Sequence, residues 1–193
     1  MRILNLSLLT LLISASSTFA DVNVVASIKP LHSLVASVMR GVGSPTLLLD
    51  GNSSPHTYSL KPEDAEKLQK AQVVFWIGHE LEAFLEKPLD TLSQNATRVA
   101  LIDAPNMKTL SVRESEHTEH HDHDDVGRDA HLWLDPENAK VMLGFISKNL
   151  SEIDPSNAKT YFANAEKAVI SLDALSTDIT KTLEPARGKK FIV

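Results

Sequence analysis

Val73-Val-Phe-Trp-Ile77, read as VVFWI, is the segment of this chain that most clearly indicates its fold. An unbroken apolar run rich in β-branched residues predicts a strand that is covered on both faces, as in the interior of a parallel sheet. Segments with helical spacing lie on both sides, over 61–71, where Pro62 suits a first turn, and over 80–92. A buried strand between two helices predicts an α/β unit.

The same alternation continues along the chain. Further strands are expected over 23–28, 46–49 and 98–102. Strands that alternate with helices and short loops favour a mostly parallel sheet flanked by helices. In such a sheet, ligands bind where loops converge at the carboxyl ends of the strands. His56, in the loop after the 46–49 strand, lies at this edge.

The last third of the chain follows a different plan. Pro136 begins one helix, and Asp154-Pro155 favours the start of a long helix over 155–185. If unbroken from Ser156 to Glu184, that helix would be about 43 Å long at about 1.5 Å per residue, which is longer than one small domain requires. Residues 188–193 are then expected to form the first strand of a second lobe. We therefore expect a truncated chain, although a short terminal strand that pairs with the sheet edge would also fit.

Residues 1–20 have the pattern of a cleavable secretory signal peptide. An apolar run too short to span a bilayer is followed by small residues that end at Ala20. The chain contains no Cys, so an exported protein of this sequence depends on its core and not on disulfides. The formal charge is −6 without a Lys/Arg cluster, which argues against nucleic-acid binding. We expect residues 21–154 to form a soluble N-terminal α/β lobe.

Histidine is the residue type in this chain that indicates metal binding. Four of the eight His crowd an acidic segment over about 113–128 that is expected to be a mobile loop, and they are His117, His120, His121 and His123. Imidazole is a favoured zinc ligand, but flexible ligands predict only weak and poorly selective accessory metal binding. The alternative is a solvated acidic loop that happens to contain His.

His56 and His131 are expected to be better positioned than the loop histidines. Pro55 stiffens the approach to His56, and the run Leu132-Trp133-Leu134 can anchor in the core and fix the direction of His131. A single loop His is usually structural or merely exposed, but two positioned imidazoles are half of a tetrahedral zinc site.

Two further residues follow the 73–77 strand at its carboxyl end. His79 and Glu80 are candidates for lining a cleft there, and a ligand role is the less favoured interpretation. His32 is expected to be a surface or core residue.

Four motifs, in this order, carry a resemblance to a known family. They are Val24-Val-Ala-Ser-Ile-Lys-Pro30, Ser54-Pro-His-Thr-Tyr-Ser-Leu-Lys-Pro62, Val74-Phe-Trp-Ile-Gly-His-Glu-Leu-Glu82 and, after a His/Asp-rich insertion, His131-Leu-Trp-Leu-Asp-Pro136. Over nearly the whole mature chain the sequence resembles the ZnuA-like zinc-binding proteins of ABC importers.

The resemblance implies two α/β lobes joined by one long rigid helix, with Zn²⁺ in the cleft between the lobes. His56 and His131 would be the ligands from the first lobe, and a third His would lie beyond Val193. It also implies a monomeric periplasmic protein that delivers zinc to the membrane permease of an ABC transporter.

Other functions on these residues stay open at this point. A manganese- or iron-binding member is one, although manganese-type relatives prefer carboxylates beside their His ligands and Pro55 stands next to His56 here. An adhesin on the same scaffold is another. A zinc hydrolase is disfavoured because the sequence has no His-Glu-x-x-His helix and no Gly-x-Ser-x-Gly turn.

Overall fold

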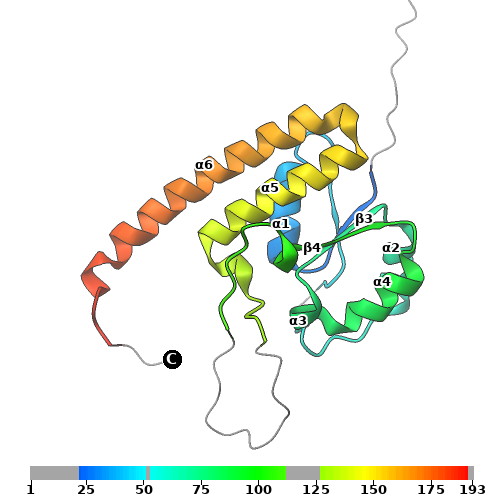
Figure 1. Ribbon diagram of the computed structural model, residues 1–193, viewed down its shortest axis with the longest axis horizontal. Coiled ribbons are helices and arrows are strands. Elements are labelled where there is room, and N and C mark those ends of the chain that lie inside the picture. Colours follow the sequence, from blue (N-terminus) through cyan, green and yellow to red (C-terminus); the bar gives the residue numbers. More distant parts are fainter. Residues whose placement is uncertain (1–21, 51–52, 112–126, 191–193) are drawn as a thin grey trace, which may run out of the picture.

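The computed structural model describes residues 22–50, 53–111 and 127–190, and within them a four-stranded parallel sheet forms the centre of the molecule (Figure 1). Its strand order is β2-β1-β3-β4, and every pairing is parallel. The bounds are β1 Val24–Ala26, β2 Thr46–Leu47, β3 Val73–Trp76 and β4 Thr97–Ala100. The predicted α/β class with a mostly parallel sheet is therefore confirmed, with strands shorter than expected.

The two central strands are buried on both faces. Every residue of β1 and the first three residues of β3 are at most 3% exposed, whereas both edge strands are partly exposed. This burial explains the unbroken apolar run in the sequence of β3. From β1 the chain passes outward to β2, and from β3 it passes outward to β4 on the other side. The order therefore reverses between β1 and β3, and in open α/β sheets ligands bind outside the carboxyl ends at such a point.

Helices connect the strands and cover the sheet. Their bounds are α1 Lys29–Val38, α2 Pro62–Lys70, α3 His79–Glu82, α4 Glu86–Leu92, α5 Pro136–Ile153 and α6 Ala158–Leu183. Helices α1, α5 and α6 pack together as one group, and α2 packs with α4 in a second group (Figure 1). Pro30, Pro62 and Pro136 stand in the first turns of α1, α2 and α5, where a missing N–H leaves no hydrogen bond unmade.

The single helix expected over 80–92 is divided. Helices α3 and α4 are separated by a 3-10 turn over Ala83–Leu85. Glu82 leaves the helical conformation, with φ −120° and ψ 51°. Its carboxylate turns back to accept hydrogen bonds from the backbone N–H groups of Ile77 and Gly78, at 2.8 and 3.1 Å. A buried carboxylate thus overrides the helical pattern of the sequence.

The long helix is confirmed in part. A 3-10 turn, Pro155–Asn157, precedes the 26 residues of α6, which span about 39 Å at about 1.5 Å per residue. The first turns of α6 pack on α1 and α5, and the rest extends beyond the other helices (Figure 1). Five large apolar side chains of α6 are exposed: Phe162, Ile170, Leu175, Ile179 and Leu183.

Several expectations concern residues at the ends and in the acidic segment. The predicted signal peptide over 1–20 and most of the His-rich segment over 113–128 lie outside the described residues. Of the strand predicted over 188–193, residues 188–190 form the end of a turn and an irregular stretch, and the rest is not described. No helix among the described residues is long and apolar enough to cross a bilayer.

Gly78 is the turn through which the chain leaves β3. Its φ is +151°, in a region that L side chains rarely adopt, and an added Cβ would lie 2.6 Å from Cγ2 of Ile102. Ile102 is 3% exposed and follows β4, so it has no room to move away. Only glycine therefore fits at position 78, where the chain leaves β3 beside the segment that follows β4.

We expect Gly78→Ala to lower the free energy of unfolding by at least about 2 kcal/mol, because it combines backbone strain with a clash in a packed core. Gly144→Ala is the matched control, since this exposed position inside α5 has no heavy atom within 4 Å of an added Cβ. That variant should be more stable by about 0.5–1 kcal/mol. Urea unfolding followed by circular dichroism measures both, and equal stabilities would contradict the assignment of Gly78 as a strained turn.

Candidate metal centre

His56 and His131 lie side by side, although 74 other residues separate them in the chain. Their ring centroids are 5.7 Å apart and the ring planes make an angle of 48°. Two imidazoles that share one tetrahedral zinc ion, with Zn–N bonds of about 2.0–2.1 Å, have ring centres about 5 Å apart. Both residues are exposed, so an ion can reach them from solvent. The pair therefore has the geometry of two ligands to one ion.

A short turn presents His56. The N–H of Thr57 donates to the carbonyl oxygen of Ser54 at 3.3 Å, so residues 54–57 form a turn with Pro55 in its second position. Proline is favoured there because its fixed φ matches the turn. The stiffening role expected of Pro55 agrees with this geometry.

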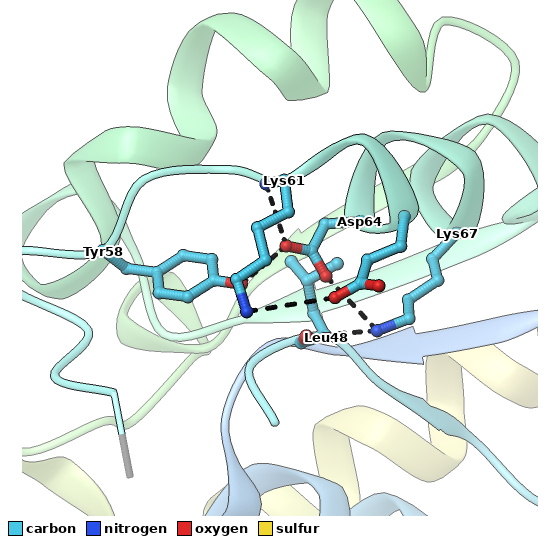
Figure 2. A network of polar contacts seen from close by, with 6 residues as sticks. Leu48, Tyr58, Lys61, Asp64 and Lys67 are labelled. Carbon is cyan, nitrogen blue, oxygen red and sulfur yellow. Dashed lines mark hydrogen bonds and ion pairs between the residues drawn. The ribbon is translucent and has the colours of Figure 1, made fainter. Parts of the chain in front are cut away.

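A network around Asp64 anchors the loop that carries His56 (Figure 2). The Tyr58 hydroxyl donates to Oδ2 of Asp64 at 2.6 Å, and the N–H of Lys61 donates to the same oxygen at 3.1 Å. Nζ of Lys67 donates to Oδ1 of Asp64 at 3.2 Å and to the carbonyl oxygen of Leu48 at 3.4 Å. The loop is thereby fixed to α2 and to the residue that follows β2.

The charges in this network explain why Asp64 is tolerated at 1% exposure. Burial opposes its ionisation, but hydrogen bonds from Tyr58, Lys61 and Lys67 outweigh it and hold the pKa of Asp64 below its ordinary value. Burial and the same carboxylate raise the pKa of Tyr58 to about 12. The Tyr58 ring also meets Phe84 edge-on, with centroids 5.2 Å apart. His56 thus sits two residues from a rigid anchor.

Alternating burial determines the direction of His131. Ala130 and Leu132 are 5% and 4% exposed, so the residue between them faces outward. The ring of His131 also packs near that of Trp133, with centroids 5.4 Å apart. The expectation that Leu134 also anchors in the core is wrong, because Leu134 is 73% exposed. Leu132–Leu134 forms a 3-10 turn, in which consecutive side chains point in different directions.

Asp129 orients the His131 ring. Its Oδ1 accepts hydrogen bonds from the backbone N–H of His131 at 3.0 Å and from Nδ1 at 2.8 Å. The hydrogen bond from the backbone N–H has the larger effect and the bond from Nδ1 the smaller one, and both hold the pKa of Asp129 below its ordinary value. An ionised carboxylate only accepts, so Nδ1 carries a proton, and in the neutral ring Nε2 is the nitrogen that offers a lone pair to a metal. The sequence prediction did not include Asp129, and the available signal was an Asp two positions before a candidate ligand.

His79 and Glu80 follow β3 at its carboxyl end as predicted, but each has another partner. Nδ1 of His79 lies 3.2 Å from Oε2 of Glu86, and Glu80 pairs with Arg128. They line a pocket of about 240 Å³ that Trp76 and Arg128 also line. The structure thus brings His56 and His131 together and engages His79 and Glu80 elsewhere.

The other histidines divide into two groups. A ring nitrogen of His32 lies 3.0 Å from the carbonyl oxygen of Pro45, which agrees with the structural role expected for it. His117, His120, His121 and His123 lie outside the described residues. In the described part of the chain, no three His, Cys, Asp or Glu side chains are grouped so as to hold a metal ion. Among the described residues, His56 and His131 are therefore a pair of imidazoles without a third His, Cys, Asp or Glu side chain grouped beside them.

Glu82 lies beneath this edge of the sheet. It is fully buried, and one oxygen accepts from the hydroxyl of Ser27, which follows β1, while the other accepts from the backbone of Ile77 and Gly78, which follow β3. Burial outweighs these hydrogen bonds and raises the pKa of Glu82 to about 7. This side chain thus adds a link between the carboxyl ends of the two central strands, beside the hydrogen bond from the Ser27 N–H to the carbonyl oxygen of Phe75.

Sequence comparison matches residues 24–193 to the family described as "Zinc-uptake complex component A periplasmic". A relative from Brucella abortus, named high-affinity zinc uptake system protein ZnuA, is 41% identical over 202 residues, covering 88% of this chain and 60% of the relative. Relatives of the same name from Paracoccus denitrificans and Yersinia pestis are 36% and 34% identical. The chain covers 60% and 63% of their lengths, so it spans about three fifths of the curated relatives it matches.

Solved structures share the fold. The AdcAII protein of Streptococcus pneumoniae superposes with a TM-score of 0.70 at 23% identity, covering 88% of this chain and 60% of that one. Zn(II)-bound AdcA from the same species gives 0.69 at 22% identity, covering 85% and 33%. The Ni²⁺ complex of FpvC from Pseudomonas aeruginosa gives 0.72 at 19% identity, covering 85% and 55%. These similarities support the arrangement of a sheet, its flanking helices and the long α6.

Glu82→Gln should change how stability depends on pH. The folded state raises the pKa of Glu82 from 4.5 to about 7, so between these values the native protein binds more protons than the unfolded chain. Stability from this group is therefore complete below about pH 4.5 and is lost as the pH rises through about 7. Gln keeps the shape and hydrogen bonds without the charge, so the variant should gain on the wild type by up to about 3 kcal/mol by pH 8.

Urea unfolding at a series of pH values measures this difference. Glu66→Gln is the control, since Glu66 is exposed on α2 and pairs only along the helix with Lys70 in the part described. Its difference from the wild type should stay nearly constant between pH 4.5 and 8. A constant difference for Glu82→Gln as well would contradict the buried, easily protonated carboxylate.

Proposed function

Since this chain belongs to the ZnuA family of periplasmic zinc-uptake components, we propose that it captures Zn²⁺ with His56 and His131 and passes it to the membrane permease of an ABC transporter. The observation that carries the proposal is the pair of imidazole rings 5.7 Å apart, one of them with its tautomer already selected by Asp129. Both features favour an ion that prefers neutral nitrogen ligands.

A third ligand is part of this proposal. Two imidazoles leave a tetrahedral ion half coordinated, and the relatives are longer than this chain. We place a further His in a second lobe that closes over the exposed faces of His56 and His131. The proposed location is the periplasm, which agrees with the secretory pattern of residues 1–20, and the proposed working state is a monomer.

Zinc is favoured over manganese by the types of donor present. Pro55 stands beside His56 and offers no carboxylate, and Asp129 is occupied in hydrogen bonds to His131. Manganese prefers oxygen ligands, whereas imidazole suits zinc. The fold itself accommodates other ions, as the Ni²⁺ and Mn²⁺ complexes of FpvC indicate for that protein. The choice of zinc therefore rests on the local donors and the family.

The proposed assignment is tested by calorimetric zinc titration of the chain and of the same chain extended with the remaining part of the Brucella abortus relative. Only the extended chain should show one tight site. His56→Ala and His131→Ala in the extended chain should each weaken that site by more than about 100-fold, because losing a group that merely orients a ligand already costs about 10–100-fold.

Two controls accompany these variants. His32→Ala removes an imidazole that hydrogen-bonds to Pro45, and it should leave the tight site unchanged. Replacing His117, His120, His121 and His123 together by Asn should remove only weak additional binding. Equal tight binding by the short and extended chains would place all ligands within these 193 residues and overturn the proposed third ligand.

A further inference from the structure

Arg128 joins the carboxyl ends of two strands. Nε donates to Oε1 of Glu80 at 2.7 Å, and Nη2 lies 2.5 Å from the same oxygen. Nη1 donates to Oδ1 of Asp103 at 3.0 Å. Glu80 lies in α3, directly after β3, and Asp103 ends the 3-10 turn that follows β4. One guanidinium therefore connects the loops of β3 and β4.

The backbone at Arg128 is also held. Arg128 forms an isolated antiparallel bridge with Ser111, and the N–H of Asp129 donates to the carbonyl oxygen of Leu110 at 2.7 Å. Asp129 then makes its two hydrogen bonds to His131. A continuous series of contacts thus runs from the sheet edge through Arg128 and Asp129 to the ring of His131.

We propose that Arg128 is a positioning residue for metal capture, which holds Asp129 in place and thereby keeps His131 at the separation from His56 that a shared ion requires. The proposal rests on the proposed function, because the shared ion is the captured zinc. A single exposed ion pair would contribute little to such an arrangement. Arg128 differs because its planar fork engages two carboxylates from different loops at once, a geometry that Lys cannot reproduce.

Charge alone predicts the opposite effect on zinc binding. A guanidinium close to a dication repels it, and its removal would also release the carboxylates of Glu80 and Asp103. If Arg128 acted only through its charge, Arg128→Gln would bind zinc more tightly. A positioning role predicts weaker binding. The direction of the change in affinity therefore distinguishes the two roles.

The test uses the chain itself and long-range ¹H–¹⁵N NMR of its imidazole rings, which reports the tautomer of each His and follows zinc binding at each ring. In the wild type, His131 should carry its proton on Nδ1, and the His56 and His131 signals should respond to zinc together. In Arg128→Gln we expect zinc affinity at this pair to fall by about 10-fold or more and His131 to populate both tautomers.

Two further variants make the test specific. Arg128→Lys keeps the charge but reaches only one carboxylate, so its affinity should lie between those of the wild type and Arg128→Gln. If the Gln variant folds poorly, the comparison of Arg128→Lys with the wild type still tests the proposal, and the backbone amide spectrum shows whether Arg128→Lys is folded. Arg98→Gln is the control, because Arg98 in β4 pairs with a single carboxylate, that of Asp90 in α4, and zinc binding should not change.

Two results would overturn the role of Arg128. One is zinc binding by Arg128→Gln that is as tight as in the wild type or tighter, and the other is an unchanged His131 tautomer in the metal-free variant. Failure of the proposed function would look different. In that case the wild-type His56 and His131 signals would not respond together to zinc, whereas the tautomer comparison would still report on Arg128.

Discussion

The two oxygens of Glu82 accept three hydrogen bonds beneath the carboxyl ends of β1 and β3. Parallel strands end with backbone N–H groups that have no further strand residue to bond, and here a buried carboxylate satisfies those of Ile77 and Gly78. The same carboxylate binds Ser27 at the end of β1. Beyond the direct pairing of β1 with β3, this contact joins the segments that leave the two central strands at their carboxyl ends.

Above this contact, two independent supports hold the two candidate ligands. The loop of His56 is fixed through Tyr58 to the buried carboxylate of Asp64, and the segment of His131 is fixed through Asp129. The first support joins its ligand to α2, the second is continued by Arg128 to the loops after β3 and β4, and the rings themselves stay exposed. Rigid supports and open rings together suit a site that must take an ion from solvent in a defined geometry.

The architecture could be predicted from the sequence because the signals for its strands and helices are local. The apolar run of β3, the Pro residues at the starts of helices and the two isolated histidines can each be recognised without knowing their neighbours. The break after Glu82, the exposure of Leu134 and the roles of Asp129 and Arg128 could not be predicted in this way. These depend on contacts across the fold: a carboxylate that turns back on its own strand, a 3-10 turn and an arginine that reaches two loops. The pairing of His56 with His131 was predicted from the segments that position them and then from the family resemblance, and the structure supplies its geometry.

The tautomer of His131 has a kinetic consequence. Because Asp129 holds the proton of Nδ1, the neutral ring has its lone pair on Nε2 before any ion arrives. Coordination by the neutral ring then needs no proton to move from one nitrogen to the other. Tautomer exchange therefore adds no step before the first Zn–N bond at this ring.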